Sequence, residues 1–386
     1  MRVVGMDVHV RNSFLCVTDA DGRPLGRRRV GNSLGELAEF LGGLPGGDQP
    51  LRVVLESTTN SRAVQRMMLD YGKGAGVAVQ AQVLDARKLR VIAESVSKCD
   101  KLDAAVLNEL ARSNLKLPAC YVPDDETFAL REHLRARSDL VRMRTMLKNR
   151  VHSILHRRGI LSPLKDLFTR EGRQWLAQLT LDDAGRLILD AYLGTLDQLG
   201  GTIDESAAAL ARLSRSQRWC KRVALLRTMP GVGPVTSLTV LAELGDVGRF
   251  KSRASVSNYA GLVPVVRASN EKSFSGHITR RGPAHLRAVL VEAAWTAVGR
   301  VPQYAAIYNR VAGRKAKQIA IVAVARRMLE DCWTMLVRDE VFRLMTVTFD
   351  VTDVRTSAPV PTGADRVDRV DRVDPVESVA GPSDAG

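Results

Sequence analysis

The chain has 386 residues, enough for more than one domain with its own core, and 45% of them are hydrophobic, as in ordinary globular proteins. Its 57 lysines and arginines exceed its 42 aspartates and glutamates, so the formal net charge is +15 and a polyanionic partner is indicated. No apolar run approaches the ~18 residues of a membrane helix, and the five scattered cysteines form no CxxC pair. These features exclude a membrane protein, a cysteine zinc site and a disulfide framework. Because the N-terminus has no signal-peptide pattern, we expect a cytoplasmic protein.

The N-terminal part of the chain alternates strands with helices. Apolar and β-branched runs predict strands at 3–8, 13–18, 24–30, 51–55 and 77–83, with helices at 34–44 and 61–71 and further helices between 85 and 112. The order β-β-β-α-β-α-β-α resembles the α/β ribonuclease-H-like fold, and more narrowly its RuvC-like branch.

Four acidic residues occupy positions that need an explanation. Asp7 lies within the first apolar strand, where an unpaired charge is costly, and Glu56 ends the fourth strand. Asp100 and Asp103 are three residues apart on a predicted helix, so their carboxylates share one face. A solvated helix would explain the last two alone. Together with the two upstream acids, they favour a site for a hard divalent cation.

The middle of the chain is predicted to be helical and strongly basic. Apolar residues keep a helical spacing over 140–154 and again over 189–213, which predicts an antiparallel helical hairpin or coiled coil. Arginines such as Arg142 and Arg150 flank the first stripe. They would contact nucleic acid or, alternatively, would only be solvated.

Two glycine-containing segments follow. Pro230-Gly231-Val232-Gly233-Pro234 resembles a helix-hairpin-helix, in which Gly231 and Gly233 let backbone N–H groups approach a phosphate at a helix N-terminus. A plain turn between helices is the alternative.

A loop is predicted at 258–287, before helices at 283–300 and 315–345. It carries Ser269, Ser273 and Ser275 beside Arg267, Lys272, Arg280 and Arg281. A serine hydroxyl near guanidinium groups either attacks a phosphate or binds one.

These patterns divide the chain into four predicted parts. They are a ribonuclease-H-like (RuvC-like) catalytic domain at 1–120, a helical coiled-coil segment for dimerisation and nucleic-acid contact at 124–218, a mainly α domain with the helix-hairpin-helix-like motif at 219–346, and a tail at 347–386. The tail is rich in Pro, Ser and Asp and contains an Arg-Val-Asp repeat, so we expect it to be disordered.

Taken in this order, the motifs resemble the DEDD transposases of the insertion-sequence-110 family, which are bridge-RNA-guided recombinases. The resemblance covers roughly residues 3–345. It depends on GMD at Gly5–Asp7, LEST at Leu55–Thr58, KCDKLDA at Lys98–Ala104, MPGVGPVTS at Met229–Ser237, YAGLVP at 259–264 and RRG at Arg280–Gly282. The combination is far more specific than any single motif.

The resemblance implies a catalytic centre. Asp7, Glu56, Asp100 and Asp103 would bind Mg²⁺, with Mn²⁺ as an alternative. The family's nucleophilic serine, counted five residues on from Pro264, falls on Ser269, with Ser273 as the alternative register. It would form a phosphoserine link to DNA, with phosphate oxygens neutralised by Arg267, Lys272, Arg280 and Arg281.

The resemblance also implies the partners. They are donor and target DNA, a structured noncoding RNA that pairs with both, and further copies of the chain in a tetramer of two dimers. The place of action would be the bacterial nucleoid.

Two other functions remain open from the residues alone. In a metal-only junction resolvase or nuclease, water attacks the phosphodiester and Ser269 only binds phosphate. In a catalytically inactive nucleic-acid-binding protein, the acids carry no activity. The presence of all four acids favours an enzyme.

Overall fold

The structure of the chain, a computed structural model, describes residues 1–86, 88, 104–113, 115–269 and 272–343. The chain divides into two compact units, Met1–Asp124 and Asp125–Gly386. Within the described ranges, no helix is long and apolar enough to cross a membrane.

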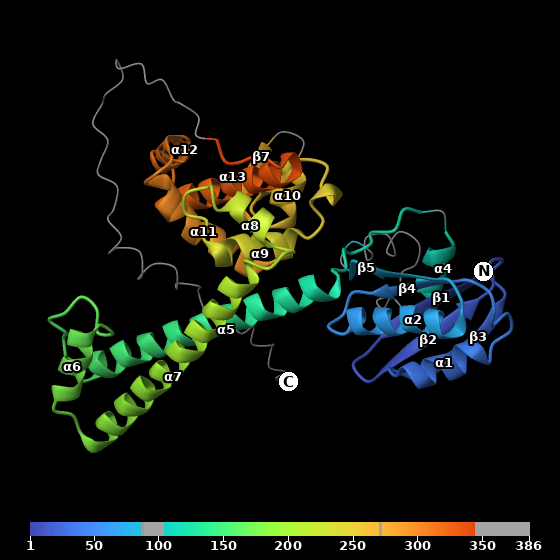
Figure 1. Cartoon of the computed structure of the whole chain (residues 1–386), viewed down its shortest axis with the longest axis horizontal. Coiled ribbons are helices and arrows are strands. Elements are labelled where there is room, and N and C mark those ends of the chain that lie inside the picture. The colour runs from blue at the N-terminus through green and yellow to red at the C-terminus, as the bar shows by residue number, and fades with distance from the viewer. Residues whose placement is uncertain (87, 89–103, 114, 270–271, 344–386) are drawn as a thin grey trace, which may run out of the picture. The chain divides into compact units, whose positions relative to one another are not determined.

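The first unit is built on a five-stranded mixed sheet (Figure 1). Its strands are β1 (Arg2–Val8), β2 (Asn12–Thr18), β3 (Pro24–Gly31), β4 (Leu51–Glu56) and β5 (Val79–Leu84), in the order β3-β2-β1-β4-β5. β2 pairs antiparallel with β1 and β3, whereas β4 pairs parallel with β1 and β5. This arrangement is consistent with the predicted ribonuclease-H-like domain.

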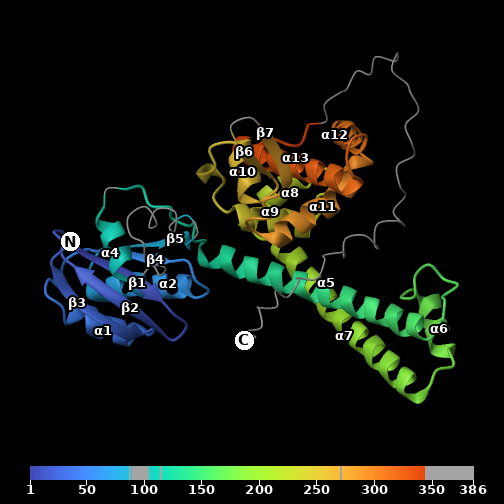
Figure 2. The same ribbon diagram turned by 180° about the vertical axis from the view of Figure 1, so that it is seen from behind.

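Helices cover both faces of this sheet, as Figure 2 shows from behind. One face carries α1 (Leu34–Gly42) and α2 (Ser61–Ala75), and their apolar residues join Val4 and Met6 of β1 in one cluster. The other carries α4 (Ala104–Arg112), which packs on Val3 of β1 and Val54 of β4. Successive strand residues point to opposite faces, so the odd-numbered residues of β1 face α4. We predicted helices between 85 and 112. Residues 87 and 89–103 of this stretch lie outside the described residues, and α4 occupies its end.

The second unit begins with two long helices, α5 (Asp125–Arg157) and α7 (Asp183–Leu213), with the short α6 (Arg170–Gln178) between them. The start of α5 packs on the end of α7 through Leu134 and Leu210, and its end packs on the start of α7 through Leu155 and Leu189. The two helices are therefore an antiparallel hairpin. A coiled-coil supercoil stays a prediction.

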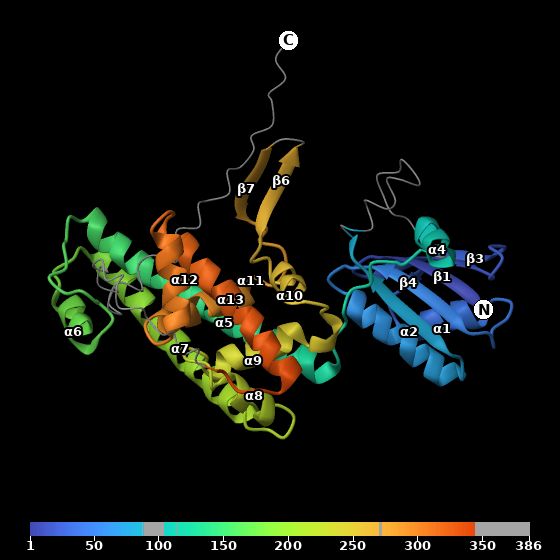
Figure 3. The same ribbon diagram turned by 90° about the horizontal axis from the view of Figure 1, so that it is seen from above.

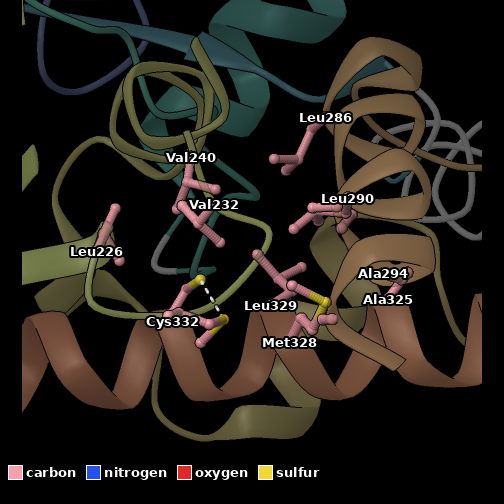
Figure 4. Close-up of a cluster of buried hydrophobic side chains, with 14 of the residues drawn as sticks. Leu226, Val232, Val240, Leu286, Leu290, Ala294, Ala325, Met328, Leu329 and Cys332 are labelled. Atoms are coloured by element: carbon pink, nitrogen blue, oxygen red, sulfur yellow. Dashed lines mark hydrogen bonds between the residues drawn. The ribbon is translucent and has the colours of Figure 1, made fainter. Parts of the chain in front are cut away.

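The rest of this unit is mainly helical. It contains α8 (Cys220–Leu226), α9 (Pro234–Leu244), the 3-10 turn η1 (Val247–Arg249), α10 (Arg253–Tyr259), β6 (Pro264–Ser269), β7 (Lys272–Ile278), α11 (Ala284–Val298), α12 (Pro302–Ala312) and α13 (Lys317–Arg338). Figure 4 shows the core between α11 and α13, where Leu290 and Leu329 meet around Val232.

Three details of this region correct the predictions. Residues 264–278 form two antiparallel strands where we predicted a loop, and Figure 3 shows this hairpin projecting from the helices. The helix α12 was not predicted. The last helix ends at Arg338 instead of 345, because Asp339 adopts a left-handed backbone conformation with φ of 54° and its N–H caps Met335.

A buried glutamate joins four helices of the second unit through its carboxylate and its backbone oxygen. Glu243, at the end of α9, is 1% exposed; its Oε1 accepts a 3.0 Å hydrogen bond from Arg135 of α5 and lies 2.9 Å from Nε2 of His285 of α11. Tyr259 of α10 donates to its backbone oxygen at 3.0 Å, as does Arg131 of α5. Burial raises the pKa of Glu243, but His285 and the two arginines outweigh it, so the net shift is downward.

We expect Glu243→Gln to lower the free energy of unfolding by about 3 kcal/mol at pH 7, the lower end of the range for a broken buried ion pair because Arg135 is half exposed. A lowered pKa stabilises the fold above the ordinary glutamate value of about 4.3, and this contribution is lost as the pH falls through the folded value. Urea unfolding at pH 7 and pH 3.5 measures both effects. The difference between the variant and wild type should be smaller at the lower pH, and the exposed Glu205→Gln should change little; equal stability at pH 7 would contradict the expectation.

Candidate active site

Two of the four predicted acids lie side by side at the sheet. β1 and β4 are parallel, and their register pairs Met6 with Leu55. The next residues along the two strands are Asp7 and Glu56. Because the carboxyl ends of neighbouring parallel strands meet at one edge, the two carboxylates come to the same level.

Asp7 and Glu56 also share a face of the sheet. Asp7 follows Gly5 by two residues and Glu56 follows Val54 by two, and both of these earlier residues contact or line the α4 side. The Asp7 side chain is 34% exposed, and its Oδ2 lies 3.4 Å from Nε2 of His9. Two partly buried carboxylates therefore face the side of the sheet on which α4 begins.

The other two acids, Asp100 and Asp103, lie outside the described residues. Among the residues that are described, no three His, Cys, Asp or Glu side chains form a group that could hold a metal ion. The donor chemistry of Asp7 and Glu56 nevertheless fits a hard divalent cation, which prefers carboxylate oxygens. Such a site would need ligands in addition to these two.

The predicted serine lies at the end of a strand. Ser269 is the last residue of β6 and is paired in register with Lys272, the first residue of β7. Residues 270–271, between them, lie outside the described residues. Along the hairpin, Ser273 pairs with Ala268 and Arg267 with Phe274. The two candidate serines are therefore at neighbouring rungs of one hairpin, on opposite strands.

The YAGLVP and RRG motifs meet at the base of this hairpin. A Cβ on Gly261 would lie less than 3.0 Å from backbone atoms of Arg281, and one on Gly282 would clash with the backbone oxygen of Tyr259. Arg280 has a left-handed φ of 50° and donates its N–H to Gly261 at 3.2 Å. Arg287 of α11, which we did not predict, donates to the carbonyls of Ala260, Arg281 and Gly282 at 3.0 to 3.2 Å. These contacts fix the turn that carries Arg280 and Arg281.

A groove of about 780 Å³ opens beside the base of the hairpin. Its apolar lining includes Ile278 of β7 and Ile319 and Val322 of α13. Its cationic side chains are Arg280, Arg310, Arg314, Lys315 and Arg326. We call this the basic groove. Only Arg280 of these cations was predicted, because the others follow it by 30 to 46 residues in the sequence.

The predicted phosphate-binding glycines have different surroundings. Gly231 has a φ of 87°, and a Cβ there would lie less than 3.0 Å from the backbone oxygen of Ala293, so this glycine is required by packing on α11. Gly233, the N-cap residue of α9, has open space around its Cβ position. Of the two, Gly233 is the one a phosphate can approach.

The predicted arginines of the helical hairpin, Arg142 and Arg150, are exposed on α5. Arg142 forms an ion pair with Asp139 on the same helix, and Arg150 lies two turns further on. Both are available to a solvent-side partner.

Sequence comparisons bear on both units. The profile described as Transposase IS116/IS110/IS902 family matches residues 223–309, which include the serine hairpin and the RRG turn. A second transposase profile, of the IS110 DEDD type, matches residues 4–158, which include Asp7, Glu56, Asp100 and Asp103.

Several curated relatives are similar over most of the chain. The transposase for insertion sequence element IS1111A of Coxiella burnetii is 24% identical over 361 residues, which are 89% of this chain and 92% of that protein. The transposase for insertion sequence element IS1328 of Yersinia enterocolitica is 23% identical, over 88% of this chain and 98% of that protein. The protein y4qE of Sinorhizobium fredii is 30% identical over 199 residues, and the match spans 48% of its length. The chain therefore carries a DEDD-type transposase domain followed by a transposase domain of the IS116/IS110/IS902 family, and is a transposase of the DEDD type.

Proposed function

We propose that this transposase cuts and exchanges DNA strands with a divalent-metal centre and a serine nucleophile, guided by a structured noncoding RNA. Asp7, Glu56, Asp100 and Asp103 would hold the metal, for which Mg²⁺ is the best fit and Mn²⁺ the alternative. Ser269 would be the nucleophile. The proposed parts of the chain are those expected from the sequence, at 1–120, 124–218, 219–346 and 347–386.

The observation that carries the proposal is that Asp7 and Glu56 directly follow the paired residues Met6 and Leu55 on adjacent parallel strands. Both carboxylates face the side of the sheet that α4 covers, and Asp103 is bonded to Ala104, the first residue of that helix. A bound metal would supply positive charge against the attacking and leaving oxygens of a phosphodiester. The acids' own part is to hold that charge in a fixed place, at the carboxyl ends of the strands.

In the proposed chemical step, Ser269 loses its hydroxyl proton and its oxygen forms a bond to the phosphorus of DNA. The bond from phosphorus to the sugar oxygen breaks, and this oxygen leaves as a hydroxyl after taking a proton. The energy of the phosphodiester is kept in the phosphoserine link, so rejoining to a second strand needs no nucleotide cofactor. Arg267, Lys272, Arg280 and Arg281 would neutralise the phosphate oxygens.

The proposed partners follow from the family resemblance and from the charge. Donor and target DNA would pair with the guide RNA, and the protein would recognise both mainly through their backbones. The antiparallel hairpin, as a coiled coil, would dimerise or present Arg142 and Arg150 to nucleic acid. The segment around Gly233 would act as a helix-hairpin-helix. A tetramer of two dimers would place the acids and serine of different copies together at the nucleoid.

The test is an incubation of the whole protein with Mg²⁺, the RNA encoded at its element's flank, and labelled donor and target DNA. Denaturing gels detect DNA covalently attached to protein. We expect an adduct and recombinant strands, both lost with a metal chelator or without the RNA. Cut DNA without an adduct would refute the serine step, and would identify the protein as a metal-only nuclease.

The basic groove gives a separate prediction about DNA binding. Arg310 and Arg314 both line this groove and are exposed, and each would neutralise one backbone phosphate. In the double variant Arg310→Ala/Arg314→Ala, duplex binding should weaken for all sequences alike. The negative slope of log affinity against log salt should become smaller in magnitude by about 2. Fluorescence anisotropy over a salt series measures the slope. Arg338→Ala, outside the groove at the end of α13, is the matched control; an unchanged slope in the double variant would exclude the groove from the DNA interface.

A further inference from the structure

A buried asparagine interrupts the apolar contact between α4 and the sheet. Asn108 is 2% exposed and lies among Leu107, Leu110 and Ala111 of the same helix. Its Nδ2 donates to the backbone oxygens of Val3 at 2.8 Å and Cys16 at 2.9 Å. Its Oδ1 accepts from the hydroxyl of Thr18 at 3.0 Å. The amide therefore binds α4 to two strands at once, β1 and β2.

These hydrogen bonds do something that the surrounding apolar contacts do not. An apolar helix face gains nearly the same burial if the helix slides or turns by a small amount, because the hydrophobic effect is non-directional. A buried amide with three partners loses them in any other position, and an unpaired buried polar group is costly. A single buried asparagine fixes helix register in this way in coiled coils. Asn108 thus selects one position of α4 on the sheet.

Gly5 fixes the same helix at its first turn. A Cβ on Gly5 would lie less than 3.0 Å from the backbone oxygen of Ala104 and the backbone nitrogen of Asn108, so the helix backbone rests directly on β1. Gly5 precedes Asp7 by two residues on the same side of the strand. The start of α4 is therefore held on Gly5, two residues before Asp7, by a contact that no larger residue permits.

We infer that Gly5, Asn108 and Thr18 form a positioning joint for the DEDD centre. This inference rests on the proposed function, since the joint sets where the chain enters α4, and the residue bonded to Ala104 is Asp103. Asn108 and Thr18 are positioning residues: they hold the helix on β1 and β2 at the level of Val3 to Gly5, two to four residues before Asp7. Loss of the joint lowers metal affinity, even in a folded protein.

The test separates register from stability. Thr18→Val/Asn108→Leu replaces the hydrogen-bonded pair by apolar groups of similar size, so the contact stays buried while its register is lost. Leu110→Ala is the matched control, because it opens a cavity in the same helix contact without touching the hydrogen bonds. Binding of Mn²⁺ to the whole protein, without nucleic acid, is measured by electron paramagnetic resonance of the free ion. Circular dichroism confirms that each variant is folded at the temperature used.

We expect the double variant to bind Mn²⁺ about tenfold more weakly than wild type, within the range for loss of groups that orient metal ligands. Leu110→Ala should have a lower Tm but the wild-type Kd. A wild-type Kd in the folded double variant, or an equal loss in Leu110→Ala, would overturn the inference and leave the proposed function standing. Asp7→Asn tests the proposed metal centre itself. If this variant binds Mn²⁺ as wild type does, or if wild type binds none, the proposed function is refuted and not only the inference.

Discussion

Ser269→Ala should abolish the covalent protein–DNA adduct and lower strand exchange at least about 10³-fold, because alanine has no oxygen with which to form the phosphoserine bond. Ser269 ends β6 at the rung next to the hairpin tip, so the replacement leaves the paired backbone intact. Binding of DNA and of the guide RNA should change little. The adduct is measured on denaturing gels and binding by mobility shift, with the same preparations.

The matched control is Ser273→Ala on the opposite strand. It pairs with Ala268, one rung from Ser269, and is the other candidate for the nucleophile. If Ser273→Ala abolishes the adduct and Ser269→Ala does not, the nucleophile is Ser273 of β7. If both variants keep full strand exchange, neither serine is the nucleophile and the phosphoserine mechanism is wrong. Cleavage that survives both replacements would favour attack by water.

The sheet of the first unit could be predicted closely because its strands carry strong apolar runs. The predicted strand at 51–55 is β4 (Leu51–Glu56), and the predicted strand at 3–8 is β1 (Arg2–Val8). The proximity of Asp7 and Glu56 depends in addition on the parallel pairing of β1 with β4, which the apolar runs do not contain. It was expected from the resemblance to the ribonuclease-H-like fold.

The features that were missed depend on packing between distant segments. The strands β6 and β7 lie in a stretch, 258–287, that is rich in Ser, Gly, Arg and Lys, so its composition indicated a loop. Only the cross-strand pairing of Arg267 with Phe274 and its neighbours makes the two strands a hairpin. The basic groove brings together Arg280 and Arg314, which are separated in the sequence by the helices α11 and α12. Asn108 reads as a surface residue of an amphipathic helix, and is buried because Gly5 lets the helix approach β1. No pattern within a short window contains these contacts.

Asp7→Asn should have the second large effect, a loss of strand cleavage of about 10³-fold without loss of the fold. Asparagine keeps the size of the side chain but removes the negative charge, and several kcal/mol of charge stabilisation in the transition state corresponds to this factor. Glu56→Gln should behave alike, because the two residues follow a paired couple on adjacent strands. The rate of single-turnover cleavage at saturating DNA measures the loss.

The control is Asp21→Asn, the same chemical change at an exposed position between β2 and β3. It should cleave at the wild-type rate, which would exclude a general effect of removing negative charge from this unit. Raising the Mg²⁺ or Mn²⁺ concentration should restore part of the activity of Asp7→Asn if the lost carboxylate binds metal, because mass action offsets a weakened site. Wild-type cleavage in Asp7→Asn would remove this residue from the centre. A lost activity that no metal concentration restores, with the Tm unchanged, would instead give Asp7 a role in orienting the DNA, next to His9 at 3.4 Å.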